Sequence, residues 1–371
     1  MNDYKKPVLA IDARLINTSG IGTVCQNTIS FLIDDFEIIL LGDITELKEF
    51  IWSTSCKIIP FSSNIYSLAE QIAFITKVPE CDYFFSPHYN VPLVPIRAKK
   101  RIVIIHDVNH IALKNQLGFV KKLYAKFVIQ QALRLSDKIL TVSNFSKSEI
   151  IRFFNIKKKK INVITLGVDK RYFRRTDENS RKPVKAKYDL PEKFLLYVGN
   201  VKPHKNLQVL IKAYHLLKVK GLHKDYKLVI VGKKDGFITR DNEISNLITN
   251  LGLSEEIIFT GFMNNEDLPV IYSLATLFVF PSLYEGFGLP PIEAMACGCP
   301  VLVSDAASLP EVCKDAAVFF NPLDEQGLHN AIVNILNNIG LQKRLQEKGL
   351  NLAATYNWPD TAAALKKVIF N

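Results

Sequence analysis

The sequence lacks any long, uninterrupted apolar run. Of its 371 residues 48% are hydrophobic, yet no run approaches the roughly 18 to 20 residues of a membrane-spanning helix. The first apolar segment, PVLAI, is short and leads directly into Asp12 and Arg14, which is typical of a buried strand and not of a secretory signal. These two absences predict a cytoplasmic protein that is not integral to a membrane.

Cysteine is scarce and poorly spaced for metal or redox chemistry. The six cysteines are scattered, and the one close pair, Cys297 and Cys299, has a single residue between its members. That spacing suits neither a zinc knuckle nor a redox CxxC motif. We therefore predict that the cysteines are small core residues or bystanders, and that the protein has no cofactor and requires no metal.

Acidic residues are sparse in one region, and this is where the positive charge gathers. The formal net charge is +11, but residues 97–187 hold 24 Lys and Arg against 6 Asp and Glu, a net +18. Such a region is either a solvated face, which is the commonest case, or a surface that meets anionic lipid or nucleic acid. The chain has no recognisable nucleic-acid motif, so we expect no nucleic-acid partner.

Short apolar segments alternate with amphipathic ones along most of the chain. Helical periodicity covers 119–135 and 146–154, further helices are expected to begin near Asn206, Asp241, Asp267 and Pro290, and the tail 324–371 is helical throughout. The expected strands are 8–13, 36–42, 82–87, 101–107, 138–143, 194–200, 226–232, 256–261, 276–282 and 300–305. Strands alternating with helices predict an α/β protein whose parallel sheets are covered on both faces.

The length predicts two domains, because single cores usually stop growing before this size. We expect an N-terminal domain over 1–172, onto which a helix of about 356–371 packs back, and a C-terminal domain over 191–355. The polar, turn-rich stretch 173–190 is the expected linker. Two such domains would leave a cleft at the carboxyl ends of their strands, where open α/β sheets bind ligands.

One amphipathic segment has two interpretations. Phe119, Leu123 and Phe127 recur every four residues, with Lys121, Lys122 and Lys126 off that stripe. The favoured prediction is a stripe that faces the core. The alternative is an amphipathic helix that makes peripheral contact with an anionic membrane.

The stretch PSLYEGFGLPPIEAMACGCPV, residues 281–301, carries the strongest chemical signal. Pro290 and Pro291 favour a helix start, Gly298 is placed to end that helix, and the preceding glycine-rich turn leaves amides that favour an anion such as phosphate. Glu293 could accept hydrogen bonds from a ribose diol, and Glu285 could reach a sugar hydroxyl or a developing positive charge. A second strand-to-helix turn places Lys202, His204 and Lys205 where a lysine could neutralise a diphosphate leaving group.

These motifs resemble the retaining glycosyltransferases of family 4, whose GT-B fold has two Rossmann-like domains facing each other across a cleft. The E-x7-E motif formed by Glu285 and Glu293 is the most specific part, supported by VGNVKPHKN, VSNFSKSEI and the early SGIG. HYNVPL, IHDVNH and SGIG look most like bacterial polysaccharide mannosyl- and rhamnosyltransferases. The resemblance covers nearly the whole chain.

The resemblance implies a role for each matching residue. Glu285 would contact the transferred sugar, His106 would hydrogen-bond that sugar, and Lys205 would bind the diphosphate. The residues expected to bind the donor are Gly20, Gly22, Gly199, Asn200, Lys202, Lys205, Gly232, Lys233, Gly261, Phe262, Glu285, Gly286, Phe287, Gly288, Leu289 and Glu293. Many members have arginine where this sequence has Asn200, so either Lys202 supplies that charge or diphosphate binding is weaker.

The resemblance therefore predicts transfer of a hexose, mannose first, to a glycan or lipid-linked saccharide in cell-surface polysaccharide synthesis. GDP-mannose is the first expected donor, followed by UDP- and dTDP-sugars. Two other functions stay open at this point. One is a GT-B epimerase or nucleotide-sugar-binding protein without transferase activity, and the other is a nucleic-acid-binding protein, which would leave the glutamate pair unexplained.

Overall fold

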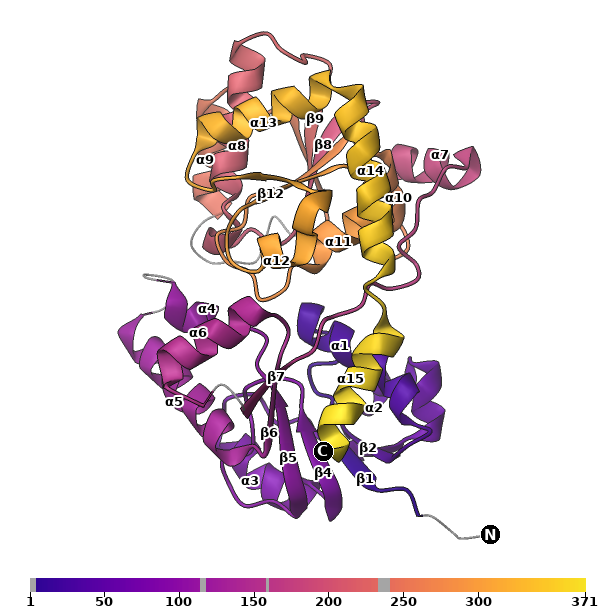
Figure 1. Ribbon diagram of the computed structural model, residues 1–371, viewed down its shortest axis with the longest axis vertical. Helices are drawn as coiled ribbons and strands as arrows, with labels where there is room; N and C mark the ends of the chain where they lie inside the picture. Colours follow the sequence, from indigo (N-terminus) through magenta and orange to yellow (C-terminus); the bar gives the residue numbers. More distant parts are fainter. Residues whose placement is uncertain (1–4, 114–117, 158–159, 233–240) are drawn as a thin grey trace. The chain divides into compact units, whose positions relative to one another are not determined.

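The chain folds into two compact units, each built on one parallel sheet (Figure 1). The computed structural model describes all residues except 1–4, 114–117, 158–159 and 233–240. Unit 1 comprises Met1–Gly167 and Asn357–Asn371, and unit 2 comprises Val168–Tyr356. The stretch 173–190, predicted as a linker, lies within unit 2 and contains helix α7 (Glu178–Lys187).

Unit 1 has a seven-stranded sheet in the order β3-β2-β1-β4-β5-β6-β7. Its strands are β1 (Val8–Asp12), β2 (Glu37–Gly42), β3 (Lys57–Pro60), β4 (Cys81–Ser86), β5 (Ala98–Ile104), β6 (Lys138–Thr141) and β7 (Ile161–Val163). Its helices are α1 (Ser19–Leu32), α2 (Ile44–Lys48), the 3₁₀ helix η1 (Ile51–Ser55), α3 (Leu68–Lys77), α4 (Asn109–Ala112), α5 (Phe119–Leu135), α6 (Asn144–Phe154) and α15 (Trp358–Phe370).

Unit 2 has a six-stranded sheet in the order β10-β9-β8-β11-β12-β13. Its strands are β8 (Phe194–Val198), β9 (Lys227–Val231), β10 (Ile257–Gly261), β11 (Leu277–Phe280), β12 (Val301–Ser304) and β13 (Val318–Phe320). Besides α7 its helices are η3 (Pro203–Lys205), α8 (Leu207–Val219), α9 (Asp241–Asn250), α10 (Leu268–Leu274), α11 (Leu289–Ala296), α12 (Leu309–Cys313), η4 (Lys314–Ala316), α13 (Glu325–Asn337) and α14 (Ile339–Ala354).

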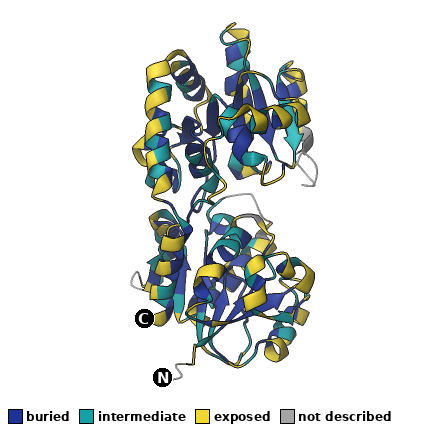
Figure 2. Cartoon of the chain, turned by 90° about the vertical axis from the view of Figure 1, so that its right-hand side faces the viewer, coloured by how far each residue is buried: buried dark blue, intermediate teal, exposed yellow. Residues whose placement is uncertain are grey.

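The ten predicted strands are confirmed, and three more were missed. The missed strands are β3, β7 and β13, and each lies at an edge of its sheet. These three edge strands are only three or four residues long and partly exposed, so they carry no buried apolar run for a pattern to detect. Central strands such as β8 and β11 are buried at every residue, as the dark blue strands of Figure 2 show.

The last helix of the chain packs within unit 1. Helix α15 lies beside α1, Phe370 stacks on Phe36 with ring centroids 4.9 Å apart, and Lys366 pairs with Asp35 at 2.8 Å. Apolar burial along α15, including Trp358, holds the C-terminal segment to this unit. Within the residues that the structure describes, no helix combines the length and apolar character needed to cross a bilayer.

The predicted core-facing stripe on α5 is wrong at Leu123 and Phe127, while the burial of Phe119 lies outside what the structure describes. Leu123 and Phe127 are 59% and 52% exposed, whereas Val128, Ile129 and Leu133 are buried in the core cluster beneath the helix. The helix has apolar residues on both faces, so the periodicity of one stripe could not tell which face meets the sheet.

A buried charge network anchors the loop after β1. The Arg14 guanidinium pairs with Asp12 at 2.6 Å and with Glu70 at 2.7 Å, and all three side chains are at least 90% buried. The guanidinium also lies over the rings of Phe61 and Phe74, 4.2 and 4.9 Å from their centroids. Arg14 thus links Asp12 at the end of β1 to Glu70 on α3.

Removing the cation from this network should destabilise unit 1. Arg14→Met leaves the carboxylates of Asp12 and Glu70 buried without a counter-ion, which costs about 3–5 kcal/mol. Both tryptophans of the chain, Trp52 and Trp358, lie in unit 1, so urea unfolding followed by tryptophan fluorescence reports on that unit alone. The control is Lys99→Met, which removes an exposed ion pair and should leave the midpoint unchanged; equal midpoints for both variants would contradict the prediction.

Candidate functional site

The strand order of unit 2 reverses between β8 and β11, and the two loops that follow these strands meet there. The Lys205 ammonium, at the end of η3, lies 2.5 Å from the Glu285 carboxylate in the loop after β11. The Ser282 hydroxyl donates to the same carboxylate oxygen at 2.6 Å, and the amide of Leu283 donates to the carbonyl of His204. The two residues predicted to act at the reacting end of a donor are thus brought together at the switch point, where α/β sheets bind ligands.

The turn that precedes α11 is held in place by hydrogen bonds from Ser308 and by packing of Phe287. The Ser308 hydroxyl lies 3.0 Å from the carbonyl oxygen of Glu285 and 2.8 Å from that of Phe287, and the Phe287 ring packs edge-on against Tyr356. Gly288 has a φ of +100°, and a Cβ there would lie 2.8 Å from Leu309. A side chain would therefore be strained at Gly288, and the glycine lets the chain turn so that α11 begins at Leu289 with its amides at the carboxyl edge of the sheet.

Three of the predicted donor-binding glycines form a row along the same edge. The Gly199 amide donates to the carbonyl of Val231, and the Gly232 amide donates to the carbonyl of Gly261 at 3.1 Å. Beyond this row Phe262 is 71% exposed. The predicted residue Lys233 lies outside the described residues.

Asn200, which stands where many members of the family have arginine, and Lys202, which could supply the missing charge, lie on the loop between β8 and η3. Asn200 and Lys202 are both exposed. The Asn206 side chain, which the sequence reasoning passed over, donates to the carbonyls of Pro281 and Pro322 at 3.1 and 2.7 Å. Asn206 thereby ties this loop to the strand end that carries Glu285.

Glu293 is enclosed by tyrosines that the sequence reasoning did not identify. The Tyr272 hydroxyl donates to its carboxyl oxygen at 3.1 Å, and Tyr172 also hydrogen-bonds to it. Burial raises the pKa of the Glu293 carboxyl to about 7, although these hydrogen bonds lower it. Tyr172 and Tyr272 come from a loop and from α10, so no local motif around Glu293 could have pointed to them.

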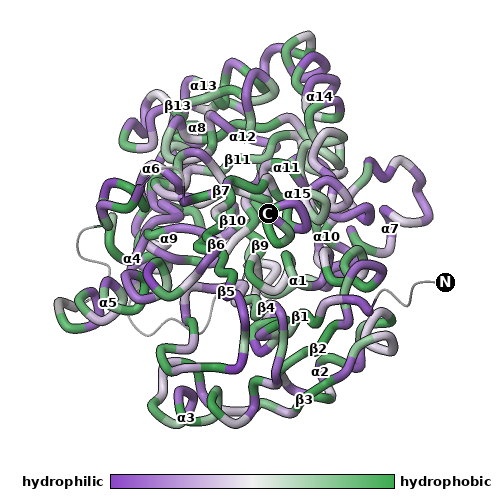
Figure 3. Tube along the Cα trace, turned by 60° about the horizontal axis from the view of Figure 1, so that its bottom comes forward, coloured by the Kyte–Doolittle hydropathy of each residue, from purple (hydrophilic) through white to green (hydrophobic). Residues whose placement is uncertain are grey.

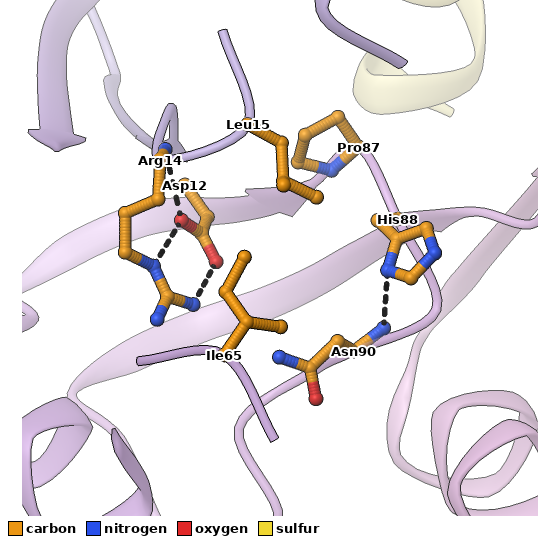
Figure 4. Close-up of a pocket in the computed structure, with 7 residues that line it drawn as sticks. All are labelled: Asp12, Arg14, Leu15, Ile65, Pro87, His88 and Asn90. Atoms are coloured by element: carbon orange, nitrogen blue, oxygen red, sulfur yellow. Dashed lines mark hydrogen bonds and ion pairs between the residues drawn. The ribbon is translucent and has the colours of Figure 1, made fainter. Parts of the chain in front are cut away.

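Unit 1 also has a hollow at its own switch point, between β1 and β4. Figure 4 shows the pocket, which is lined by Asp12, Arg14, Leu15, Ile65, Pro87, His88 and Asn90. The Asn90 amide donates to Nδ1 of His88 at 3.3 Å. Burial is the main cause that lowers the pKa of His88 to about 3, so its imidazole is neutral at physiological pH. His88 and Asn90 lie in the HYNVPL motif, which could have signalled them.

His106, predicted to contact the donor sugar, follows β5 in unit 1. Its Nε2 lies 3.0 Å from the carbonyl oxygen of Pro87, so that nitrogen carries the proton and Nδ1 is the acceptor. Burial lowers the pKa of the His106 imidazole. A neutral His106 can therefore accept a hydrogen bond from a hydroxyl group.

The two glycines of the SGIG motif differ in their surroundings. A Cβ on Gly22 would lie 2.0 Å from the carbonyl oxygen of Ile16, whereas a Cβ on Gly20 would meet nothing within 4 Å. Gly22 is thus required by packing of α1 against the preceding loop. Gly20 has room around it, as a position that admits a ligand would.

The predicted residues divide between the units. Gly20, Gly22 and His106 belong to unit 1, and the described remainder belongs to unit 2. Among the described residues, no group of three or more His, Cys, Asp or Glu side chains is arranged to hold a metal ion.

Two family models match the chain in tandem. The model described as glycosyl transferases group 1 matches residues 178–351, and that of glycosyltransferase family 4 matches residues 56–172. The O-antigen chain mannosyltransferase B of Escherichia coli is 33% identical over 71% of this chain and 68% of its own length. The serotype-specific mannosyltransferase WbdA of the same species is 33% identical over 81% of this chain, but the chain spans only 38% of that protein.

Solved structures show the same fold. The Anabaena protein HepE, in complex with UDP and glucose, matches with a TM-score of 0.79 at 18% identity, over 99% of this chain and 100% of that one. WaaG, a glycosyltransferase involved in lipopolysaccharide biosynthesis, matches with a TM-score of 0.74 at 17% identity, over 96% and 99% of the two chains. The predicted fold class, two parallel-sheet Rossmann-like domains of GT-B type, is confirmed.

The raised pKa of Glu293 makes nucleotide binding depend on pH. If ribose hydroxyls donate to this carboxylate, binding favours the ionised form, so affinity for a nucleoside diphosphate should rise with pH through about 7. If the Glu293 carboxyl releases one proton on binding, the dissociation constant should be about tenfold larger at pH 6 than at pH 8.

Isothermal titration calorimetry of the wild type and of Glu293→Gln measures this difference. The nucleotide's own phosphate titrates in both proteins, so the variant supplies the reference profile. We expect the variant to lack the additional dependence near pH 7. Parallel pH profiles for the two proteins would show that Glu293 does not bind the ribose.

Proposed function

This chain belongs to the group 1 glycosyl transferases, and on that premise we propose that it is a retaining mannosyltransferase acting in cell-surface polysaccharide synthesis. The observation that carries the proposal is the Lys205–Glu285 pair at the switch point of unit 2, beside the N-terminal amides of α11. A cation, a carboxylate and helix amides converge there, as a sugar diphosphate needs.

Mannose is proposed on the names of the relatives. Two O-antigen chain mannosyltransferases, from Escherichia coli and Salmonella typhimurium, align over about seven tenths of their length. We therefore take GDP-mannose as the first donor. The UDP bound to HepE supports UDP- and dTDP-sugars as the next candidates, because the base is recognised by a pocket that no single motif defines.

In the proposed reaction Lys205 exchanges one anion for another. Without donor its ammonium is paired with Glu285 and both side chains are less than a fifth exposed. A donor diphosphate is the stronger anion, and it would draw the ammonium away and free the Glu285 carboxylate to face the sugar. Lys205 and the amides of α11 would then neutralise the leaving diphosphate as the glycosidic bond breaks, so we propose that no metal is needed.

Retention of configuration is proposed to follow from the departing phosphate. The acceptor hydroxyl would attack on the face that the phosphate leaves and give its proton to a phosphate oxygen, while Glu285 stabilises the positive charge that develops on the sugar. The protein supplies position and electrostatics, and no covalent sugar–enzyme bond forms.

The acceptor is proposed to bind unit 1. The Asn90 backbone amide donates to Nδ1 of His88, and the Asn90 side-chain amide donates to Glu70. The pocket at the β1–β4 switch point therefore offers Nε2 of the neutral His88 imidazole and the side-chain carbonyl oxygen of Asn90, groups that hydrogen-bond uncharged sugar hydroxyls. A glycan or lipid-linked saccharide fits this chemistry. We place the reaction in the cytoplasm. No observation favours the alternatives of nucleic-acid binding or epimerisation.

The function is tested by incubating the protein with GDP-mannose, UDP-glucose or a dTDP-sugar and a lipid-linked saccharide acceptor, in buffer that contains EDTA. We expect transfer from GDP-mannose to be fastest and the product linkage to keep the donor's anomeric configuration, as read by NMR. An inverted linkage, or loss of transfer in EDTA that added Mg²⁺ restores, would refute the proposed chemistry. Donor consumption without a glycosylated product would point to an epimerase.

Glu285→Gln should abolish most transfer without unfolding unit 2. The amide keeps the size of the side chain but removes its charge, and loss of one electrostatic contact to a transition state typically lowers kcat by about 10²–10³. The matched control is Glu347→Gln, an exposed glutamate on α14 of the same unit. Circular dichroism confirms the fold of both variants, and wild-type kcat in Glu285→Gln would exclude the residue from catalysis.

A further inference from the structure

Two helices of unit 1 expose apolar side chains that their sequences would normally bury. On α3, Leu68, Ile72 and Ile75 follow one another at intervals of four and three residues and are 86%, 66% and 49% exposed. The opposite side of this helix buries Phe74 against Phe84, with ring centroids 6.1 Å apart. The exposed stripe is therefore additional to the stripe that packs on the sheet.

Helix α5 repeats this arrangement. Val120, Leu123 and Phe127 are 78%, 59% and 52% exposed, while Val128 and Ile129 belong to the buried cluster. Contiguous exposed apolar surface of this kind marks a site of contact with another body. In Figure 3 both helices carry green, hydrophobic segments among purple ones.

The two exposed stripes lie on the same side of unit 1. Strand register pairs Phe84 with Arg101, and pairs Val103 with Ile139, so these side chains share one face of the sheet. Helix α3 packs on this face through Phe74, and α5 packs on it through the cluster that contains Val103 and Ile139. The rings of Tyr66 and Tyr124 join the helices, with centroids 6.2 Å apart.

We name this surface the α3–α5 face. It consists of Tyr66, Leu68, Ile72, Ile75, Val120, Leu123, Tyr124 and Phe127.

Basic side chains border the α3–α5 face, and the two helices themselves carry no exposed acidic side chain. Helix α5 carries Lys121, Lys122, Lys126 and Arg134 and no acidic residue. The one acidic residue of α3, Glu70, is buried against Arg14. An apolar centre with a basic border is complementary to an anionic lipid surface, whose acyl region accepts the apolar side chains and whose headgroups attract the lysines.

We propose that the α3–α5 face docks this protein on an anionic bilayer. A second copy of the chain is a poorer occupant, because a two-fold interface would place the same lysines of α5 against each other. The bilayer needs no complementary acidic patch on a partner. The docking surface is independent of the transfer reaction, so it stands or falls separately from the proposed function.

Docking would also bring the pocket of unit 1 to the lipid surface. Tyr66 holds a left-handed backbone conformation with φ of +69°, and its amide donates to Glu70 at 2.8 Å. Its hydroxyl lies 3.3 Å from that of Tyr89, and its ring lies beside His88, which lines the pocket. This consequence rests on the proposed function: a saccharide on a lipid carrier would enter the pocket from the docked face.

The experiment is flotation of the full chain with vesicles of phosphatidylcholine, alone or mixed with an equal part of phosphatidylglycerol. We expect the wild type to bind the anionic vesicles and to bind the neutral ones weakly. Lys121→Gln/Lys126→Gln should weaken anionic binding about twenty-five-fold, because each lysine near such a surface contributes about fivefold. Leu123→Ser/Phe127→Ser should weaken it at least about tenfold.

The matched control variants make the same types of substitution at exposed positions outside the α3–α5 face. Ile51→Ser/Val219→Ser replaces two apolar residues that are 91% and 67% exposed, and Lys193→Gln/Lys343→Gln removes two exposed lysines; both should bind like the wild type. Thermal shift with GDP, UDP and dTDP gives the nucleotide response of unit 2, and it should be the same in every variant whether or not transfer is observed.

Three results would overturn the proposal. The first is a wild type that does not bind anionic vesicles, and the second is equal weakening in the control variants. The third is a wild-type dimer, seen by light scattering, that Leu123→Ser/Phe127→Ser converts to a monomer, since the face would then be covered by a second copy.

Discussion

Each sheet reverses its strand order once, and this reversal constrains everything else in the molecule. At the reversal the loops from two neighbouring strands run to opposite faces, so the carboxyl edge opens and backbone amides there are left for a ligand. In unit 2 the opening lies between β8 and β11 and contains Lys205 and Glu285. In unit 1 it lies between β1 and β4 and contains the pocket of His88 and Asn90.

The two openings hold positive charge in different ways. Arg14 is at least 90% buried, paired with two carboxylates and covered by two aromatic rings. Arg14 therefore cannot leave this network to bind a ligand, because moving it would leave two buried anions unpaired. Lys205 is paired with the single carboxylate of Glu285 and keeps some contact with solvent. Its ammonium is compact and flexible, so an incoming diphosphate can replace the carboxylate at small cost.

The surface of unit 1 is not uniformly polar. The sheet of unit 1 is covered by α3 and α5, and each helix has a second apolar stripe that no described element covers. Exposing this apolar area to water costs free energy, and polar residues at the same positions would avoid that cost. Because this apolar area lies beside lysines, a lipid surface is its proposed partner. The Tyr66–Tyr89 contact connects the α3–α5 face to the pocket.

The sequence by itself determined the two parallel sheets, ten of their thirteen strands and the glycosyltransferase motif of Glu285 and Glu293, because these depend on local apolar runs and on spacing within one loop. Only the tertiary structure decided which face of α5 meets the core, since both faces carry apolar residues. It alone placed Lys205 beside Glu285, which are 80 residues apart, and enclosed Glu293 with Tyr172 and Tyr272. The three short edge strands β3, β7 and β13 and the partners of buried charges are set by contacts between distant segments, and no local pattern records them.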